Sequence, residues 1–388
     1  MDCKKDACFM QKALELAVKG RPFPNPYVGC VIVKEGKVIG EGWHEKAGKA
    51  HAEINAIENV KKKFGKKAGE MLANSVMYVN LEPCNHKGRT GPCSDEIIKN
   101  KIKKIVIGMK DENEKVKGGG TDELRKKGVE VEIGILGEKA RALNAAYLKH
   151  VKTGMPLITL KMAMSLDGRT ATKTGDSKWI SGKKAREIVH KMRGKVGAVM
   201  VGIGTILADN PHLTCRVEGG KDPLRVIVDG NLRIPHDANV LFDKNVVIAC
   251  MKDADKEKKK MLEGRKIKLI ECPSKSDVKF DLKYLFKQLG KMGINHVMCE
   301  GGAELAAELI KEELVDEIIL FVAPKIIGGE RAGIFGGMGV LEIGDAKKAE
   351  IVRHEMIEDD LMIVAKAGWK VRGAAKGLYG AIGMLSLG

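Results

Sequence analysis

Two runs of alternating helix and strand signals, separated by one sharp break, most strongly constrain what this chain can fold into. In the first run, the expected helices cover residues 6–19, 52–64, 94–100, 121–128 and 138–151. The expected strands of the same run cover residues 28–34, 37–44, 75–81, 104–109 and 129–134. Alternation of this kind predicts an α/β layer sandwich, because each sheet face must be covered by helices.

The break lies at residues 152–156, where a helix stop is followed by Pro156 and a fresh apolar strand at 157–165. Beyond it the expected strands cover residues 197–202, 225–229, 245–250, 267–271, 295–299, 316–322 and 359–367. The expected helices there cover residues 182–193, 253–264, 281–292 and 302–311. A length of 388 residues fits two or three domains. We therefore predict domains at 1–151 and 152–367, followed by a tail at 368–388 that has no clear periodicity.

The formal net charge of +17 admits three kinds of partner: nucleic acid, a membrane surface, or small anionic substrates. Aromatic residues make up only 4% of the chain, whereas proteins that bind single-stranded nucleic acid place aromatic rings beside basic residues. No apolar stretch reaches the roughly 18 residues that a membrane span needs. We therefore expect most of the charge to be a solvated lysine-rich surface, and we expect no nucleic-acid or membrane partner.

The cysteine count indicates the compartment. The chain has nine cysteines, an odd number, and its N-terminus lacks the apolar core of a secretory signal. A disulfide framework is therefore not expected, and a cytoplasmic location is the default prediction.

Three residues of the first half form a set that suits zinc. His51 opens an expected helix, Cys84 follows an expected strand in Glu82-Pro83-Cys84, and Cys93 precedes another helix. One imidazole and two thiolates leave the fourth tetrahedral position of zinc to water, which is typical of catalytic sites. Such a metal lowers the pKa of its water to about 7. Glu53, two residues after His51, would act as the proton shuttle, a pattern typical of zinc deaminases.

The loop between the two cysteines is longer than usual. Eight residues separate Cys84 from Cys93, whereas two is the common number in cytidine and transfer-RNA deaminases. The loop carries His86, Lys87 and Arg89, which could contact an anion such as a phosphate. The alternative for the whole set, a core histidine with two buried thiols, is disfavoured by the order and spacing of the residues.

Four motifs stand out in the first half: Pro24-Asn25-Pro26-x-Val28-Gly29, Gly42-Trp43-His44, His51-Ala52-Glu53 and Glu82-Pro83-Cys84-x-His86-x-Gly88-Arg89-Thr90-x-Pro92-Cys93. Taken together, they resemble the bifunctional riboflavin biosynthesis deaminase/reductase family. The resemblance implies a cytidine-deaminase-like fold and a pyrimidine deaminase. It also implies that the substrate is held by Asn25, His44, His86 and Arg89. The family's Asp-x-Asn-Pro element departs from its pattern here, since Glu114 replaces the proline.

The motifs of the second half indicate a function less clearly when the resemblance is left aside. Gly202-x-Gly204 lacks the third glycine of a dinucleotide fingerprint, and Glu300-Gly301-Gly302-Ala303 reads equally as a phosphate-binding turn or a tight strand-to-helix turn. The motifs around residues 161–169, 175–181 and 204–216 resemble the same family's reductase, which is similar to dihydrofolate reductase in fold and uses NADPH. On the substrate side the resemblance places Lys161, Ser177, Arg193, Leu213, Arg216 and Glu300. On the cofactor side it places Ala163, Trp179, Thr205, Asp209, Gly301, Gly302, Ala303 and Glu304.

The sequence thus predicts an enzyme with two sites. The first would use zinc hydroxide to deaminate a diaminopyrimidinone ribose phosphate, and the second would reduce the ribosyl group to ribityl with NADPH. Arg193 and Arg216 are apt for the ribose phosphate, because guanidinium binds phosphate bidentately. Two rival hypotheses are a nucleic-acid-base deaminase fused to an unrelated nucleotide-binding module and a protein whose second half is catalytically silent. The family resemblance alone implies a homodimer.

Overall fold

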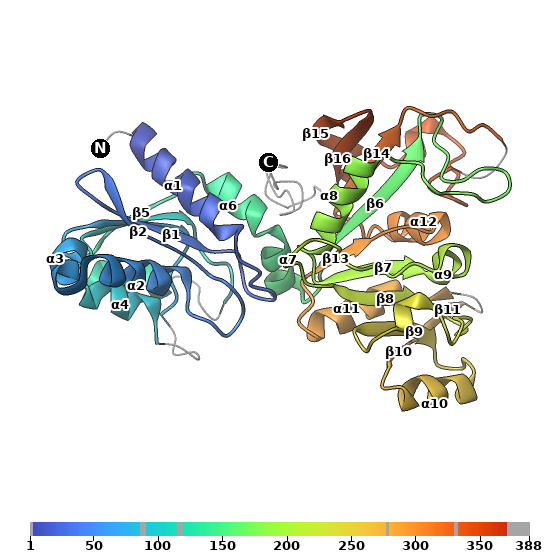
Figure 1. The fold of residues 1–388 in the computed structure, drawn as a ribbon, viewed down its shortest axis with the longest axis horizontal. Coiled ribbons are helices and arrows are strands. Elements are labelled where there is room, and N and C mark those ends of the chain that lie inside the picture. Colours follow the sequence, from blue (N-terminus) through green and yellow to red (C-terminus); the bar gives the residue numbers. More distant parts are fainter. Residues whose placement is uncertain (1–2, 86–90, 115–118, 277–278, 330–332, 371–388) are drawn as a thin grey trace. The chain divides into compact units, whose positions relative to one another are not determined.

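The computed structural model describes residues 3–85, 91–114, 119–276, 279–329 and 333–370 (Figure 1). The chain divides into two compact units, the first ending at Thr153 and the second beginning at Gly154. The break between them falls within the predicted boundary segment. The expected tail begins with a 3-10 turn at Gly368–Lys370, and residues 371–388 lie outside the described part.

The first unit is built on a five-stranded sheet with the strand order β2-β1-β3-β4-β5. β1 pairs antiparallel with β2 and β3, and the remaining pairs are parallel. The strands are β1 (Gly29–Lys34), β2 (Lys37–Trp43), β3 (Val76–Leu81), β4 (Lys104–Met109) and β5 (Glu130–Ile133). Glu35 and Gly36 both have positive φ, which is the backbone that a two-residue hairpin turn requires, so the strands expected at 28–34 and 37–44 form a hairpin.

Helices cover both faces of this sheet (Figure 1). They are α1 (Cys3–Ala17), α2 (Ala52–Phe64), α3 (Ala68–Leu72), α4 (Cys93–Lys99), α5 (Gly119–Lys126), α6 (Gly137–Leu143) and α7 (Ala145–Thr153), with a 3-10 turn at Gly65–Lys67. Along β1, Val31 and Val33 pack in one buried cluster with Met10, whereas Ile32 packs in the other with Ala56. This period of two confirms the predicted sandwich, because successive side chains of a strand point to opposite faces.

The helix expected at 138–151 is broken in two at Asn144. The side-chain oxygen of Asn144 accepts from the backbone N–H of Tyr27 at 2.7 Å, and its amide donates to the carbonyl of Tyr27 at 3.0 Å. Asn144 is 1% exposed. Its side chain therefore satisfies a distant buried backbone segment instead of continuing the helix, and periodicity alone could not reveal that contact.

The second unit contains a nine-stranded sheet with the order β10-β9-β8-β7-β13-β6-β14-β16-β15. It is parallel from β10 to β14, and β16 and β15 add antiparallel strands at one edge. The strands are β6 (Leu157–Ser165), β7 (Ala198–Gly202), β8 (Leu224–Val228), β9 (Val246–Met251), β10 (Lys268–Cys272), β13 (His296–Cys299), β14 (Glu317–Ala323), β15 (Ala349–Ile357) and β16 (Asp360–Ala367). A small separate hairpin joins β11 (Ser274–Ser276) to β12 (Lys279–Phe280).

Four helices of the second unit follow the expected segments, and a fifth was not expected. They are α8 (Lys183–Arg193), α9 (Ile203–Asp209), α10 (Lys256–Gly264), α11 (Leu282–Lys291) and α12 (Ala303–Lys311), with 3-10 turns at Asn239–Leu241 and Ile343–Asp345. The sequence did not predict α9, which is only seven residues long, or the short β11–β12 hairpin. It also did not predict β15, in which Ile357 alone is buried, so that no alternation of buried and exposed side chains marks the strand. Among the described residues, no helix has the length and apolar character needed to traverse a bilayer.

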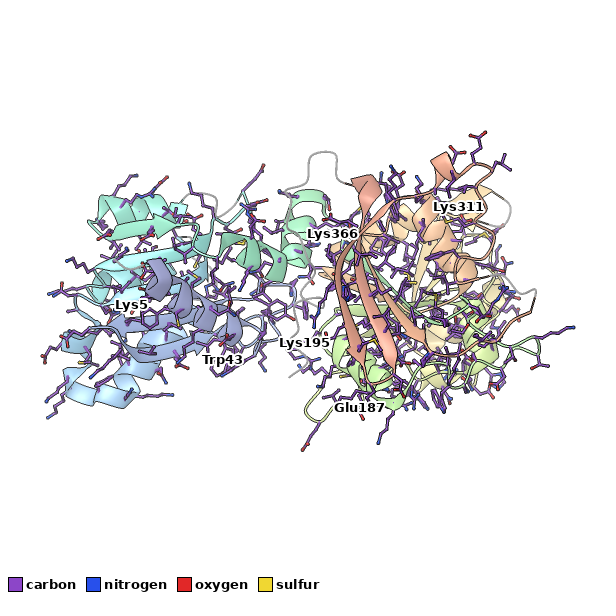
Figure 2. All side chains as sticks on the ribbon, turned by 90° about the horizontal axis from the view of Figure 1, so that it is seen from above. Lys5, Trp43, Glu187, Lys195, Lys311 and Lys366 are labelled. Atoms are coloured by element: carbon purple, nitrogen blue, oxygen red, sulfur yellow. The ribbon has the colours of Figure 1, made fainter. Side chains whose placement is uncertain are left out.

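The excess of lysine is spread over the surfaces of both units. Lys5 and Lys311 are exposed examples (Figure 2). Several lysines pair with an acid three residues away, such as Lys61 with Glu58 at 2.8 Å. Exposed pairs of this kind contribute little to stability. The arrangement agrees with the expectation of a solvated surface.

Candidate active sites

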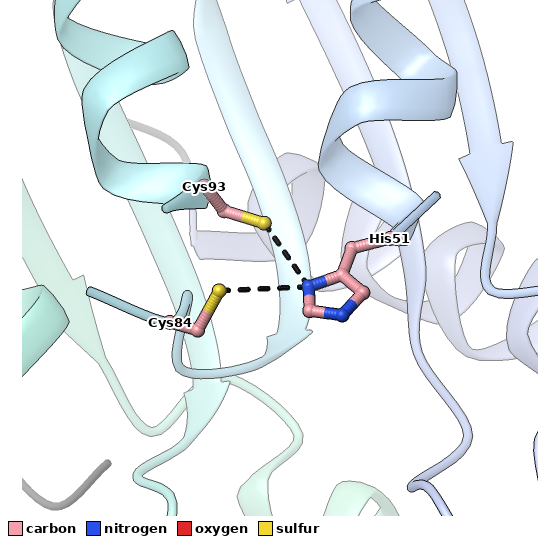
Figure 3. Close-up of side chains that lie close together, drawn as sticks. All are labelled: His51, Cys84 and Cys93. Atoms are coloured by element: carbon pink, nitrogen blue, oxygen red, sulfur yellow. Dashed lines mark hydrogen bonds between the residues drawn. The ribbon is translucent and has the colours of Figure 1, made fainter. Parts of the chain in front are cut away.

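His51, Cys84 and Cys93 converge in the first unit (Figure 3). His51 Nδ1 lies 3.3 Å from Cys93 Sγ and 3.5 Å from Cys84 Sγ, and the three donor atoms all lie within 4.8 Å of one another. Nitrogen and sulfur donors in this number are the set that zinc prefers. The residues present therefore fit a zinc ion with one coordination position left open.

Each of the three side chains projects from the end of a regular element. His51 is the N-cap of α2, with the extended backbone φ −73° and ψ 165°, as its expected place at the helix entry requires. Cys84 follows β3, and Cys93 is the first residue of α4. The sequence predicted a helix over residues 94–100, but α4 begins one residue earlier, with Pro92 at the cap. The shift places Cys93 in the first turn of α4.

The pKa values of the two thiols are shifted in opposite directions. Hydrogen bonds from Cys93 and His51 lower the pKa of Cys84 to about 4, overcoming the effect of burial. The hydrogen bond to Cys84 and burial raise the pKa of Cys93 well above its ordinary value. A bound dication would favour ionisation of both thiols.

Glu53 is buried beside this cluster, and one of its carboxyl oxygens has no hydrogen-bond partner among the described residues. The residue is 3% exposed, and that oxygen is Oε2. Burial raises the pKa of Glu53 above its ordinary value. A buried carboxyl oxygen without a partner is costly, so it points to a proton-bearing ligand at this position.

Asn25 and His44 form a hydrogen-bonded pair next to His51. His44 Nδ1 lies 3.0 Å from the carbonyl oxygen of Ala50, to which it donates, so the neutral ring accepts at Nε2 from Asn25 Nδ2, also at 3.0 Å. Burial lowers the pKa of His44, which favours this neutral form. The rings of His44 and His51 meet edge to face at 5.3 Å. The structure thus brings Asn25 and His44 to the cluster, whereas His86 and Arg89 lie outside the described residues.

Glu82 is a structural residue of this site whose role sequence reasoning missed. Its carboxylate accepts from the backbone N–H and hydroxyl of Thr121, at 3.0 and 2.6 Å, and from the backbone N–H of Asp111 at 3.1 Å. Glu82 is 3% exposed. It therefore ties two loops to the segment that carries Cys84, and an acid placed directly after a buried strand was the available signal.

Close packing of α2 against β2 positions His51, and Gly42 makes it possible. A Cβ atom at Gly42 would overlap the backbone of Ala52 and Ala56. We expect Gly42→Ala to lower the free energy of unfolding by about 1–3 kcal/mol, measured by denaturant titration, and to reduce bound zinc. Gly69→Ala is the matched control, because a Cβ there meets nothing within 4 Å. Equal stability of the two variants would contradict this packing role.

The second unit contains a cavity of about 600 Å³. All six residues expected on the substrate side line it, namely Lys161, Ser177, Arg193, Leu213, Arg216 and Glu300. Four residues expected on the cofactor side also line it, namely Ala163, Trp179, Thr205 and Asp209. The expected Gly301, Gly302, Ala303 and Glu304 are not among the lining residues.

The 301–304 turn nevertheless lies close to the cavity wall. Gly301 and Gly302 have φ of 108° and 81°, a backbone that favours glycine, and the turn leads into α12. A Cβ atom on Gly302 would lie 3.6 Å from Thr205 Oγ1, and Thr205 lines the cavity. The residues present fit a phosphate-bearing cofactor, because glycine backbone lies at a helix N-terminus beside a cavity.

Arg193 and Glu300 form a bidentate ion pair in the cavity. Arg193 Nε donates to Glu300 Oε1 at 2.6 Å, and Nη2 donates to Oε2 at 3.0 Å. The side chains are 14% and 7% exposed. Lys161 also faces this pair, and burial lowers the pKa of its ammonium group. Arg193 was expected to bind a phosphate bidentately, but Glu300 occupies the Nε and Nη2 donors, the fork of its guanidinium group.

Two further contacts shape the cavity. Ser177 Oγ donates to Asp209 Oδ1 at 3.2 Å, which joins the 175–181 segment to the end of α9. The guanidinium of Arg186 stacks 4.5 Å from the ring centroid of Trp179, which is 63% exposed. Arg186 and His190 also line the cavity, although the sequence did not single them out. Their place on α8, about two turns and one turn before Arg193, was the available signal.

Comparisons with known proteins match both units. The family profile for the cytidine and deoxycytidylate deaminase zinc-binding region matches residues 3–109, and that for the RibD C-terminal domain matches residues 156–363. The riboflavin biosynthesis protein RibD of Aquifex aeolicus is 40% identical over 364 residues, covering 93% of this chain and 98% of the relative. RibD of Escherichia coli is 35% identical over 367 residues, covering 90% and 96%.

Solved structures agree with this match over nearly the whole chain. A structure of RibD from Acinetobacter baumannii has a TM-score of 0.84 at 36% identity and covers 94% of this chain and 99% of its own. A Thermotoga maritima diaminohydroxyphosphoribosylaminopyrimidine deaminase/5-amino-6-(5-phosphoribosylamino)uracil reductase has a TM-score of 0.83 at 34% identity, covering 95% and 100%. The expected two-part fold class is confirmed. With the deaminase and reductase domains both present, the chain belongs to the RibD family of bifunctional riboflavin biosynthesis enzymes.

Proposed function

We propose that residues 1–151 carry the deaminase activity and residues 152–367 the NADPH-dependent reductase activity. In the first domain, His51, Cys84 and Cys93 would hold zinc, which supplies Lewis-acid activation of water at neutral pH. Glu53 would take a proton from that water and deliver it to the amino group that leaves as ammonia. The buried, unpartnered Oε2 atom of Glu53 beside the three ligands is the observation that carries this assignment.

Asn25 and His44 would orient the pyrimidine against Glu53. The bond between His44 Nδ1 and the Ala50 carbonyl fixes the tautomer of the ring, and the bond to Asn25 fixes the amide. Two mutually oriented polar side chains can recognise a pyrimidine edge without reorganising when it binds. His86 and Arg89 remain proposed substrate contacts on the strength of the family motif alone.

In the second domain the cavity would hold the deaminated substrate beside NADPH, which supplies the hydride when bound. The substrate would contact Lys161, Ser177, Arg193, Leu213, Arg216 and Glu300. The cofactor would contact Ala163, Trp179, Thr205, Asp209, Gly301, Gly302, Ala303 and Glu304. Since Glu300 occupies the fork of Arg193, we assign the substrate phosphate to Arg216, which is exposed and lines the cavity.

One experiment tests both assignments on the full chain. We expect purified protein with diaminohydroxyphosphoribosylaminopyrimidine to release ammonia, and to oxidise NADPH as well when that cofactor is added. Removal of zinc with a chelator should abolish ammonia release but spare NADPH oxidation on 5-amino-6-(5-phosphoribosylamino)uracil. Loss of both activities in a chain that stays folded, or ammonia release that survives zinc removal, would contradict the assignment.

We further propose a cytoplasmic homodimer. Eight cysteines of the described chain have free thiols, which suits a reducing compartment. Apolar side chains are exposed on the edge strand β15 and in the segment before it: Ile351 and Met356 at 62% and 61%, and Leu341 at 101%. Exposed apolar clusters on a sheet edge are typical of interfaces. Sedimentation of the purified protein at twice the chain mass would support the dimer, and sedimentation at the mass of one chain would refute it.

A further inference from the structure

Two side chains of helix α8 bind one carbonyl oxygen of the loop from Leu213 to Arg216. That oxygen, of Thr214, accepts from His190 Nδ1 at 3.0 Å and from Arg193 Nη1 at 3.1 Å. The two donors lie three residues apart on α8 and therefore share a helix face. Cys215 Sγ lies 3.3 Å from the carbonyl oxygen of His190, which adds a bond between the same two segments.

This loop needs external support. Leu213 has φ of 56°, a left-handed conformation that branched and bulky residues rarely adopt, and it is 3% exposed. Such a backbone persists only where neighbouring groups hold it. Leu213 and Arg216 flank the anchored Thr214 and both line the cavity. The positions of these two side chains therefore depend on how the Thr214 peptide is held.

Of the two donor side chains, His190 is the one whose replacement tests the bond to this loop most directly. Arg193 also forms the ion pair with Glu300, so a change at Arg193 disturbs two interactions together. The imidazole of His190 must carry its proton on Nδ1, because a carbonyl oxygen can only accept. Burial and the charge of Arg193 lower the pKa of His190, which keeps the ring neutral near Arg216.

We infer that His190 is a positioning residue of the reductase cavity: by anchoring the Thr214 carbonyl it holds Arg216 in place for the phosphate of the substrate. The inference rests on the proposed function, which assigns the phosphate to Arg216. Loss of the anchor loosens the loop and weakens binding of the phosphorylated substrate. The rate of hydride transfer from the bound state changes little, because the ion pair of Arg193 and Glu300 stays intact.

The test uses the full chain with NADPH and 5-amino-6-(5-phosphoribosylamino)uracil. We expect His190→Ala to raise the KM for this substrate about tenfold, the effect of one lost buried hydrogen bond, with kcat within about twofold. His190→Asn should restore the KM, since its amide N–H can occupy the place of Nδ1. His190→Gln, of similar polarity but with its N–H one bond further out, should behave like the alanine variant. The exposed His236→Ala is the matched control.

A double-mutant cycle with Arg216→Gln separates this inference from the function on which it rests. If Arg216→Gln leaves the KM unchanged, the phosphate assignment itself is wrong. If Arg216→Gln raises the KM and added His190→Ala raises it no further, the inference is supported. It is overturned if the two effects multiply, if His190→Ala lowers kcat instead, or if the asparagine and glutamine variants behave alike.

Discussion

Replacing Glu53 by glutamine should reduce ammonia release by about 10²–10⁴-fold, the usual contribution of a positioned general acid–base group. Glutamine keeps the shape of the side chain but cannot accept and return a proton. The carboxyl oxygen that finds no partner among the described residues would be replaced by an amide in the same buried space. The variant should therefore fold and retain zinc. Ammonia release with and without NADPH measures the effect.

The control for this prediction is the other activity of the same protein. NADPH oxidation on 5-amino-6-(5-phosphoribosylamino)uracil should match that of the unaltered chain, and zinc content should stay at one ion per chain. Glu58→Gln is a suitable surface control, because Glu58 lies on the same helix and pairs with Lys61 in solvent. A glutamine variant at position 53 that retains full ammonia release would remove Glu53 from the mechanism.

Breaking the Arg193–Glu300 pair should have the second largest effect. Replacing Arg193 by methionine leaves a buried carboxylate without its counter-ion, which costs about 3–5 kcal/mol of stability in comparable buried pairs. We expect the second unit to unfold at lower denaturant concentration and NADPH oxidation to be lost. Ammonia release should persist, because the pair lies wholly in the second unit.

The same pair predicts a pH dependence. Burial alone would raise the pKa of Glu300, but the charge and hydrogen bonds of Arg193 reverse the shift and hold the pKa below its ordinary value of 4.5. The pair therefore stabilises the fold fully above pH 4.5, and this contribution is lost as the pH falls through the lowered pKa. The stability difference between the unaltered chain and Glu300→Gln, measured across pH 3–7, should shrink at the acidic end. A constant difference would exclude this linkage.

The sequence predicted best where one local pattern decides the outcome. α2 begins and ends at the predicted residues, Ala52 and Phe64, because apolar periodicity sets the helix. β4 does so at Lys104 and Met109, because a short continuous apolar run sets the strand. The three proposed zinc ligands were found because each stands beside an element end in a short motif. These signals need no knowledge of tertiary contacts.

Long-range contacts account for the structural features that sequence patterns could not predict. The fork of Arg193 is taken by Glu300, which lies far along the chain, so composition and spacing could not distinguish a phosphate ligand from an ion-pair partner. Likewise, Asn144 interrupts a helix because of a bond to Tyr27. Propensity is a weak prior in such places, since a specific buried partner outweighs it.

The central place of β6 has a consequence for the order in which the protein is made. β6 is the first strand of the second unit, yet Leu157 pairs with His296 on one side and Thr159 with Glu317 on the other. During synthesis, the first unit therefore leaves the ribosome before either partner strand of β6 has been made. Chains that stall before residue 296 would carry a complete deaminase half and an unpaired apolar strand that is prone to aggregation. The risk of aggregation is therefore greatest before synthesis of the second unit is complete.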